Sequence, residues 1–355
     1  MITKQPFGST ASGQAVELYR MENADGSYAE IITYGAALQS LAVPDKNGTL
    51  ADVTVGFDDI AGHEQYSNYQ GMTVGRYANR IAGGVFSLDG QRYSVIKNEK
   101  DRNCLHGGGE FSHVVWAAEI LGEETLRLTY TSPDGAFGFP GTVEAQVTYR
   151  FCAESIADGA ARALVIDYKA VSDRKTVLNL TNHTYFNLSG RPERDILGHE
   201  MQIQAETFTP ADEHSIPTGE LRPVHGTAFD FTELKPIGRD IRAEDTQLIQ
   251  CKGYDHNLCL RPGTADTPAV LVREPESGRV MEVYTDLPGV QLYTGNFLAG
   301  APGKGGAAIQ AHAGFCLETQ HYPDTPNQPA FPQCTFEAGE AFCSRTKFLF
   351  RVEKE

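Results

Sequence analysis

The sequence predicts an all-β protein in which antiparallel sheets pack as one large β-sandwich. The first observation is a recurring unit, a short run of alternating apolar and polar residues that ends in a turn signal. The second is the supply of turn residues, because 36 glycines and 18 prolines are enough to separate many strands. The third is the scarcity of helical periodicity. We expect a single domain over residues 1–355, since no low-complexity linker or fixed-period repeat divides the chain.

The strongest local signal is a hairpin over Val85–Val95. Asp89-Gly90 lies between its two alternating arms, and this dipeptide favours a type I′ turn, in which both central residues need positive φ. Further strands are expected at 125–130, 142–151, 164–171, 201–208, 280–284 and 290–294, and short helical turns near 58–63 and 240–247. We interpret the glycine-rich stretch 300–306 as a surface loop, because it lacks the spacing of a phosphate-binding loop.

A strand over residues 178–188 carries the most informative pattern. Alternation puts five polar or aromatic residues on one face, opposite a mostly apolar face: Asn179, Thr181, His183, Tyr185 and Asn187. Amides, hydroxyls and an aromatic ring around a histidine suit a polyhydroxylated, uncharged ligand, whereas a solvated face would more often carry Lys and Glu. The alternative is a water-facing strand whose histidine has no function.

Composition and charge limit the classes of partner. With 41% hydrophobic and 21% charged residues, the chain is expected to bury a core. A formal charge of −16 without a Lys/Arg cluster argues against nucleic acid and anionic membranes. No secretory signal or long apolar run is visible. Seven cysteines without a C-x-x-C pair argue against a disulfide framework or a zinc cage, so we expect a cytoplasmic protein.

Six segments concentrate reactive or hydrogen-bonding side chains among glycines. They are 75–81 with Asn79 and Arg80, 103–109 with His106, 178–188 with His183 and Tyr185, 253–257 with Asp255, 289–297 with Gln291, and 314–323 with Glu318. Taken singly, each has a structural alternative. A histidine beside glycines can be structural, Arg80 can pair with a carboxylate, Asp255 can cap a turn, and Glu318 can be an exposed strand residue. Cys316, two residues before Glu318 on the same strand face, hints at partial burial of that carboxylate.

Together and in this order, the six segments resemble the aldose 1-epimerases, the galactose mutarotases in particular. The resemblance runs from about residue 10 to the C-terminus. Thr-Asn-His-Thr-Tyr-Phe-Asn-Leu at 181–188 and Leu-Glu-Thr-Gln at 317–320 are highly specific motifs. Gly-Tyr-Asp-His at 253–256 and Leu-His-Gly-Gly at 105–108 are moderately specific. The resemblance implies the mutarotase-type β-supersandwich fold.

The resemblance also implies roles for the matched residues. His183 is then the general acid and Glu318 the general base, while the sugar hydroxyls are bound by Asn79, Arg80, His106, Asp255, Gln291 and, on the strand face of His183, Tyr185. The implied reaction interconverts α and β anomers of a free hexose such as galactose or glucose. A carboxylate suits proton removal from the C1 hydroxyl, and an imidazolium suits proton delivery to the ring oxygen. No cofactor or metal is required, the partner is a small sugar, and we expect a monomer or homodimer.

Three alternatives remain at this point. In a glycoside hydrolase, Asp255 and Glu318 would flank the scissile bond, although such enzymes normally use a carboxylic acid rather than a histidine as the proton donor. A non-catalytic sugar-binding sandwich would explain the polar strand face and Arg80 without needing paired titratable groups. A metal site could be built from His106, His183 and Glu318.

Overall fold

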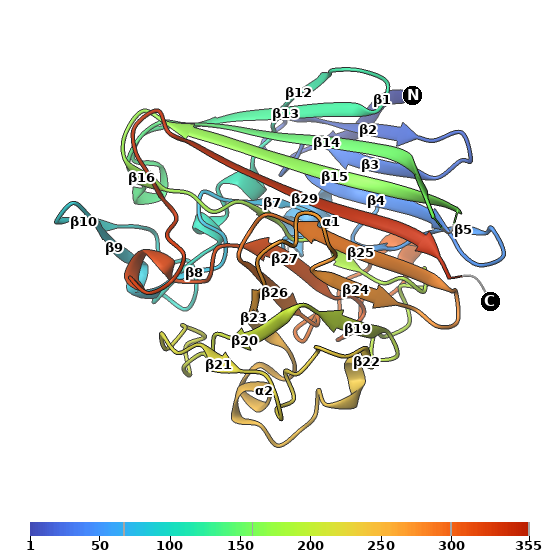
Figure 1. Ribbon diagram of the computed structural model, residues 1–355. Helices are drawn as coiled ribbons and strands as arrows, with labels where there is room; N and C mark the ends of the chain where they lie inside the picture. The colour runs from blue at the N-terminus through green and yellow to red at the C-terminus, as the bar shows by residue number, and fades with distance from the viewer. Residues whose placement is uncertain (67, 158, 299, 354–355) are drawn as a thin grey trace.

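The computed structural model describes residues 1–66, 68–157, 159–298 and 300–353, and it consists mainly of β-strands (Figure 1). Within this part of the chain, the pairings between named strands are all antiparallel. The predicted all-β, antiparallel sandwich is therefore confirmed.

Three sheets account for most of the strands. The first follows the chain through β1 (Ile2–Ser9), β2 (Ala15–Glu22), β3 (Tyr28–Ile32), β4 (Ala37–Pro44) and β5 (Leu50–Asp52). The second runs in the order β12 (Ala117–Ile120), β13 (Thr125–Ser132), β14 (Val143–Ile156), β15 (Gly159–Ser172), β29 (Ala341–Val352), β25 (Arg279–Thr285), β24 (Val270–Arg273), β19 (Glu200–Ile203) and β22 (Lys235–Pro236). The third runs in the order β21 (Arg222–Pro223), β20 (Ala205–Phe208), β23 (Asp255–Leu260), β26 (Gly289–Tyr293) and β27 (Cys316–Gln320).

Short elements connect these sheets. The two-stranded pairs are β8 (Arg80–Ile81) with β11 (Cys104–Leu105), β9 (Val85–Leu88) with β10 (Gln91–Ser94), β16 (Thr176–Val177) with β28 (Thr335–Phe336), β17 (Thr181–Asn182) with β7 (Thr73–Val74), and β18 (Tyr185–Phe186) with β6 (Thr54–Val55). The helices are α1 (Ile60–Gln65) and α2 (Thr246–Cys251). Single 3₁₀ turns are η1 (Ala82–Gly84), η2 (His106–Gly109), η3 (Phe111–His113), η4 (Ala136–Gly138), η5 (Ile237–Arg239), η6 (Lys304–Gly306) and η7 (Thr325–Asn327).

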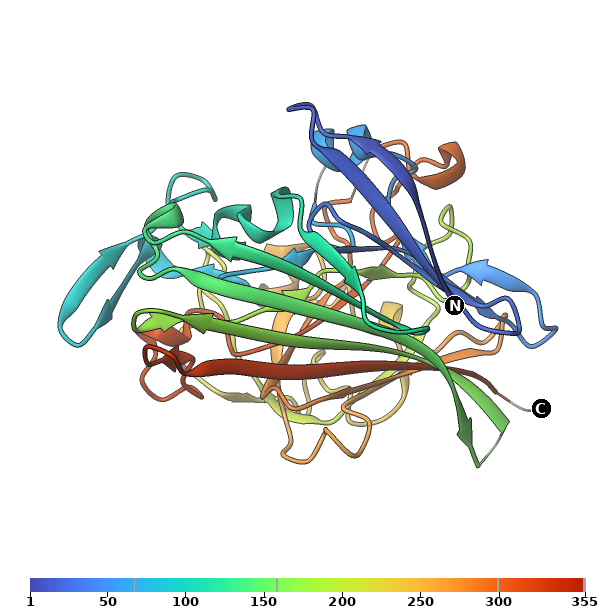
Figure 2. The ribbon, with the colours of Figure 1, turned by 90° about the horizontal axis from the view of Figure 1, so that it is seen from above.

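The main core lies where the inner faces of the sheets meet. Figure 2 shows the N-terminal strands and the long strands of the second sheet as separate layers. Leu41 of β4, Tyr149 of β14 and Phe348 of β29 belong to one buried cluster. The Tyr149 hydroxyl also donates to the Ala36 carbonyl at 2.7 Å, so its one polar atom is satisfied within the core. This packing fixes the first sheet against the second.

The hairpin predicted at Val85–Val95 is confirmed. Strands β9 and β10 pair from Leu88–Gln91 to Val85–Ser94, and the turn residues Asp89 and Gly90 have φ values of 50° and 81°. Both central residues are thus in the left-handed region that a type I′ turn requires. The predicted helix near 58–63 is also present as α1, which Asp59 caps by accepting from the Gly62 N–H at 2.8 Å.

The prediction of one continuous strand over 178–188 is wrong. The segment contains two short strands, β17 and β18, which pair with β7 and β6 respectively. The break has a local cause, because the Asn182 side chain accepts from the Thr184 backbone N–H at 3.0 Å and from the Thr184 hydroxyl. This Asx turn bends the backbone between the two strands.

Two other boundaries differ from the prediction, and the loop predicted at 300–306 makes an additional contact. The run 201–208 is split between β19 of the second sheet and β20 of the third. The second helix begins at Thr246, six residues later than predicted, because Asp245 supplies its N-cap. Within the loop at 300–306, the Lys304 ammonium donates to Asp52 Oδ2 at 2.7 Å and to Thr54 Oγ1 at 2.8 Å.

No helix in the described ranges is long and apolar enough to cross a membrane. The seven cysteines, all within the described residues, are free thiols.

Candidate active site

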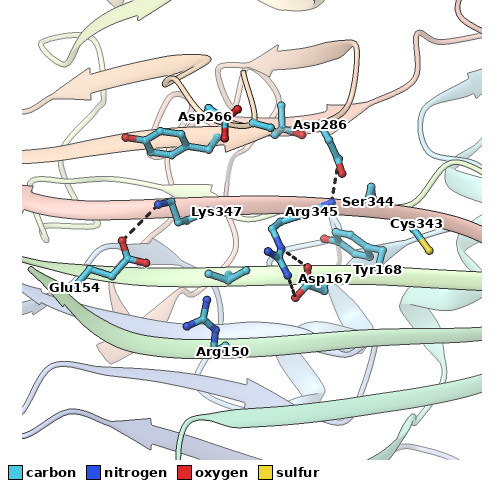
Figure 3. A pocket seen from close by; sticks show the side chains of 14 residues that line it. Arg150, Glu154, Asp167, Tyr168, Asp266, Asp286, Cys343, Ser344, Arg345 and Lys347 are labelled. Carbon is cyan, nitrogen blue, oxygen red and sulfur yellow. Dashed lines mark hydrogen bonds and ion pairs between the residues drawn. The ribbon is translucent and has the colours of Figure 1, made fainter. Parts of the chain in front are cut away.

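One hollow of the described residues is not the candidate site. It has a volume of about 670 Å³ and lies on the outer face of β14, β15 and β29 (Figure 3). Its charged side chains pair with one another: Arg345 Nε donates to Asp167 Oδ1 at 2.6 Å, and Lys347 Nζ lies 3.4 Å from Glu154 Oε2. The eight residues predicted from the sequence to act on a sugar are absent from its lining.

A second cavity, of about 380 Å³, brings together seven of those eight residues. Its lining includes Asn79, Arg80, His106, His183, Tyr185, Asp255 and Glu318. They come from segments up to about 240 residues apart in the sequence, so the fold rather than the local sequence assembles the cavity. Gln291 is not in the lining; it lies behind Asp255.

His183 is held between β17 and β18 by its own backbone. Its N–H donates to the Met72 carbonyl at 2.9 Å, and its carbonyl accepts from the Gly71 N–H at 3.0 Å. Of the polar row predicted on this segment, only His183 and Tyr185 line the cavity. Asn179 and Asn187 instead donate to backbone carbonyls, such as those of His321 and Ala313, and therefore hold neighbouring loops in place.

Glu318 enters the cavity from the third sheet. It sits on β27, where it pairs with Gln291 of β26, and two residues earlier Cys316 pairs with Tyr293. Only 2% of the Glu318 side chain is exposed, so the alternative of an exposed strand residue is wrong. Its Oε2 atom is buried and has no hydrogen-bond partner among the described residues. A buried carboxylate oxygen without a partner is costly unless a ligand supplies one.

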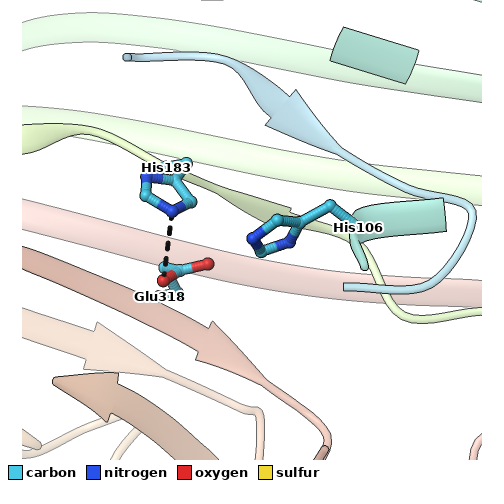
Figure 4. A group of neighbouring side chains, drawn as sticks. All are labelled: His106, His183 and Glu318. Atoms are coloured by element: carbon cyan, nitrogen blue, oxygen red, sulfur yellow. Dashed lines mark ion pairs between the residues drawn. The ribbon is translucent and has the colours of Figure 1, made fainter. Parts of the chain in front are cut away.

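His183 and Glu318 meet directly. Nε2 of His183 lies 3.6 Å from Oε1 of Glu318, and the imidazole of His106 stands beside them, with its centroid 5.3 Å from that of His183 (Figure 4). The separation of 3.6 Å is within ion-pair range but beyond a good hydrogen bond. Each group therefore keeps capacity to bind an oxygen atom of a ligand.

Burial shifts the acid–base properties of this pair in opposite directions. Desolvation lowers the pKa of His183 to about 4. Desolvation, reinforced by the charge of Asp255, raises the pKa of Glu318 well above its usual value. Together the two groups share one transferable proton over a wide pH range, and this proton can reside on the carboxyl group or on the imidazole.

His106 is held by a reciprocal contact with Asn79. The backbone N–H of His106 donates to the Asn79 carbonyl at 2.9 Å, and the backbone N–H of Asn79 donates to ring atom Nδ1 of His106 at 3.2 Å. Nδ1 is therefore an acceptor. Desolvation, together with the neighbouring His183 and Arg80, lowers the pKa of His106 well below its usual value, so the ring is neutral. A neutral ring whose Nδ1 accepts carries its hydrogen on Nε2, where it can be donated to a sugar oxygen.

The turn that carries His106 requires glycine at position 107. Gly107 has φ +61°, and a Cβ there would lie 2.3 Å from the Gly75 carbonyl oxygen. We expect Gly107→Ala to lower the free energy of unfolding by at least about 2 kcal/mol, since both the strain of a left-handed backbone and a backbone clash are added. Thermal and urea unfolding measure this change.

A matched control separates the two causes. Gly83 has φ +62° but open space around its Cβ position, so Gly83→Ala adds the backbone strain alone. An equal loss of stability in both variants would contradict the clash.

Arg80 and Asp255 form the charged end of the cavity. Arg80 Nε and Nη2 donate to Glu99 Oε1 at 3.0 and 2.8 Å, so the structural alternative of a carboxylate partner is correct, yet Arg80 also lines the cavity. Burial alone lowers the pKa of Arg80, but the charges of Asp255 and Glu99 outweigh it, and the net shift is upward. The guanidinium is therefore a permanent donor.

Asp255 is oriented by a chain of amides. Gln291 Nε2 donates to Asp255 Oδ1 at 2.7 Å, and Gln320 Nε2 lies 3.4 Å from Gln291 Oε1. Gln291 is buried, and its contact is with the carboxylate rather than with the cavity. This position makes Gln291 a support for Asp255.

Three aromatic residues of the lining were missed at the level of sequence: Tyr69, Tyr293 and Phe297. Tyr69 and Tyr293 flank His183 with ring centroids 5.8 and 6.3 Å away. Phe297 is 55% exposed, and its backbone N–H donates to the Tyr293 hydroxyl at 3.1 Å. Tyr293 and Phe297 lie in the same glycine-rich segment as Gln291, so a search of that segment for aromatic residues could have found them.

Tyr185, which the sequence did predict, has its hydroxyl hydrogen already in use. That hydroxyl donates to the Asn68 carbonyl at 3.0 Å.

Comparison with known proteins gives a consistent answer. The family model described as aldose 1-epimerase matches residues 17–349. The chain belongs to the aldose 1-epimerase family. It is 41% identical over 354 residues to galactose mutarotase from Homo sapiens, covering 99% of each chain. It is 34% identical over 345 residues to aldose 1-epimerase from Escherichia coli, covering 96% of this chain and 97% of the other.

Solved structures agree with this assignment. Galactose 1-epimerase from Lactobacillus acidophilus superposes with a TM-score of 0.86 at 26% identity, covering 100% of this chain and 99% of the other. The predicted family and the mutarotase-like fold are therefore confirmed. This member of the family is an isomerase that interconverts the anomers of an aldose, as the sequence predicted.

Proposed function

We propose that Glu318 and His183 carry out anomer interconversion as general base and general acid. The observation that supports this assignment is the 3.6 Å separation of His183 Nε2 and Glu318 Oε1 at the wall of the cavity. The anomeric hydroxyl and the ring oxygen of a hemiacetal are both bonded to C1, so they lie only one bond angle apart. An acid and a base that act on these two oxygens at the same time must therefore also lie close to each other.

The proton movements balance within the pair. Glu318 removes the proton from the C1 hydroxyl while His183 delivers its Nε2 proton to the ring oxygen, and the C1–O5 bond breaks to give the open aldehyde. Rotation about C1–C2 presents the other face of the carbonyl group. Ring closure then returns one proton from Glu318 to O1 and one from O5 to His183. Each role contributes on the order of 10²–10⁴ in rate.

We propose that the remaining polar residues bind the sugar away from C1. The Nε2–H of His106 donates to the ring oxygen or an adjacent hydroxyl, and Arg80 and Asp255 form charge-assisted hydrogen bonds with hydroxyls further round the ring. Asn79 and Tyr185 complete the wall, with Gln291 acting through Asp255. Such a grip on the far hydroxyls leaves the C1 end free to rotate.

We propose a free hexose such as galactose or glucose as substrate. The relatives named galactose mutarotase support this choice, and a hydrogen-bonding lining whose charged residues carry both signs suits an uncharged sugar. Polarimetry on freshly dissolved α-galactose and α-glucose tests it: the optical rotation should reach equilibrium faster with the protein than without. Absence of any acceleration for either sugar would overturn the proposal.

An aryl-glycoside assay and a sugar-binding measurement, alongside polarimetry, address the alternatives. A glycoside hydrolase would release the phenol from an aryl glycoside, whereas the proposed mechanism needs a free C1 hydroxyl and predicts no release. A sugar-binding sandwich would bind without accelerating mutarotation.

The three residues of the metal alternative lie close together. One ligand atom from each of His106, His183 and Glu318 lies within 4.8 Å of the others. Two zinc ligands that are each about 2.1 Å from the ion lie at most about 4.2 Å apart. Any two of these ligand atoms that are farther apart than this would have to move closer before they could share one ion. The acid–base mechanism predicts unchanged kcat after treatment with EDTA and dialysis; a loss that added Zn²⁺ restores would contradict it.

The pH dependence of kcat should show a broad plateau. Below about pH 4, His183 becomes protonated while Glu318 still holds its proton, so the base is lost. Above the raised pKa of Glu318, the pair loses its shared proton and the acid is lost. Between these limits a constant fraction of the pair is the reactive imidazolium–carboxylate form. Initial rates from pH 3.5 to 9, corrected for uncatalysed mutarotation, measure this profile, and a sharp optimum near pH 6 would contradict it.

We further propose that the whole chain acts as one catalytic unit in the cytoplasm, as a monomer or homodimer. The origin of the lining residues, from Asn79 to Glu318, supports a single unit. Free thiols are typical of a reducing compartment. Light scattering coupled to gel filtration measures the oligomeric state.

A further inference from the structure

One buried side chain next to the acid–base pair has no role in the mechanism so far. Cys316 lies on β27, two residues before Glu318, and its Sγ atom is 3.4 Å from Nδ1 of His183. This distance is within hydrogen-bonding range for sulfur. The other nitrogen of the same ring, Nε2, faces Glu318. A single strand therefore contacts both nitrogens of the imidazole, one through Cys316 and the other through Glu318.

The chemistry of the acid dictates what Nδ1 must do. In its charged form His183 carries hydrogens on both nitrogens, and after it has delivered the Nε2 hydrogen to the ring oxygen only the Nδ1 hydrogen remains. Nδ1 is therefore a donor throughout the cycle, and its partner has to be an acceptor. In serine protease triads a carboxylate fills this place and stabilises the imidazolium. Here a sulfur atom, which is a weak acceptor, lies at Nδ1, and the ring also has a hydrogen bond with the backbone of His183, which is likewise uncharged.

The sulfur is also uncharged. Cys316 is fully buried, and desolvation raises the pKa of its thiol well above the usual value. A neutral partner orients the ring without adding a negative charge that would hold the proton on His183. An imidazolium that is not stabilised in this way is a stronger acid toward the weakly basic ring oxygen.

We propose that Cys316 is a positioning residue for the acid: its sulfur accepts the Nδ1–H of His183, fixing the neutral tautomer in which Nδ1 holds the ring hydrogen and Nε2 is free to take up and deliver the transferable proton. This inference rests on the proposed role of His183. Cys316 is absent from the residues that line the cavity, so it acts through the imidazole and not on the sugar.

The test compares two substitutions at this position. Cys316→Ala removes the acceptor and should lower kcat about three- to tenfold, the range expected for the loss of one neutral hydrogen bond, with KM changed by less than about twofold. Cys316→Ser restores an acceptor and should recover kcat to within about threefold of the original protein. Cys152→Ala is the matched control, because Cys152 is buried in a separate cluster and should leave both constants unchanged.

Spectroscopy gives a readout that does not depend on activity. In ¹H–¹⁵N correlation spectra at neutral pH, His183 of the unsubstituted protein should show a protonated Nδ1 and a bare Nε2, and this preference should weaken in Cys316→Ala. The resonances are assigned by their loss in His183→Asn.

Several outcomes would overturn the proposal. They are a protonated Nε2 with a bare Nδ1 in the unsubstituted protein, a kcat for Cys316→Ala equal to that of the control, and a Ser variant as slow as the Ala variant. The last would indicate a packing role alone.

The proposed function fails by a different observation, namely that the unsubstituted protein does not accelerate mutarotation. The tautomer of His183 can still be measured in that case. If Cys316→Ala does not fold, the tautomer of the unsubstituted protein and the Ser variant decide.

Discussion

Replacing Glu318 by Gln is expected to lower kcat for mutarotation at least a hundredfold while the protein remains folded. The amide preserves the shape of the side chain but cannot take the proton of the C1 hydroxyl, and general-base catalysis contributes on the order of 10²–10⁴. Folding should survive, because the amide has the shape of the carboxyl group it replaces and is uncharged, so its burial adds no charge next to the Oε2 position that lacks a partner. Polarimetry at saturating sugar measures kcat, and circular dichroism checks the fold.

A buried glutamate elsewhere provides the control. Glu30 on β3 is 8% exposed and pairs with Arg20, and neither residue lines the cavity. Glu30→Gln should keep kcat within about twofold of the original value. A Glu318→Gln variant that matched this control would refute the role of Glu318 as base, and retained sugar binding with full loss of catalysis would exclude a purely binding role.

Replacing His183 by Asn is expected to have an effect of similar size, again at least a hundredfold on kcat. Asparagine keeps a hydrogen-bond donor at the cavity wall but has no proton to deliver to the ring oxygen at accessible pH. His63→Asn is a suitable control, because His63 is 1% exposed, has a pKa lowered to about 4 by desolvation, and lies outside the cavity lining. Near-normal turnover in His183→Asn would remove the assigned acid.

The residual rates of the two variants should depend on pH in opposite directions. With Glu318→Gln the remaining catalyst is the imidazolium of His183, so the rate falls as pH rises through its pKa of about 4. With His183→Asn the remaining catalyst is the carboxylate of Glu318, whose pKa is raised, so the rate increases with pH. Rates that change in the same direction in both variants would mean that the acid and base are assigned to the wrong residues.

Features encoded in short stretches of sequence were predictable. Asp89-Gly90 specifies its own turn, and the alternation on either side specifies the two arms. The residues of the candidate site were also found, because they stand in motifs rich in glycine and in reactive side chains. Seven of them line one cavity, although their roles remain predictions.

Features that depend on distant partners were not predictable. The alternation at 178–188 indicated one strand, but its two halves pair with two different distant strands, β7 and β6. Gln291 stands in a matching motif, yet its amide is directed to Asp255 because β26 and β23 are neighbours. The neutral state of His183 likewise follows from burial by several segments, which one strand pattern does not reveal.

The ammonium group of Lys304 connects the loop after Phe297, a residue of the cavity lining, to the N-terminal part of the molecule. It is 15% exposed and is surrounded by oxygen atoms of Asp52, Thr54, Ser40 and Gln39. Lys304 comes seven residues after Phe297, which lines the cavity. Anyone shortening this loop, or grafting one from a relative to alter sugar preference, would therefore have to carry the lysine along with its acceptors. Without it, the half-buried carboxylate of Asp52 would lose its counter-charge at a position away from the intended change.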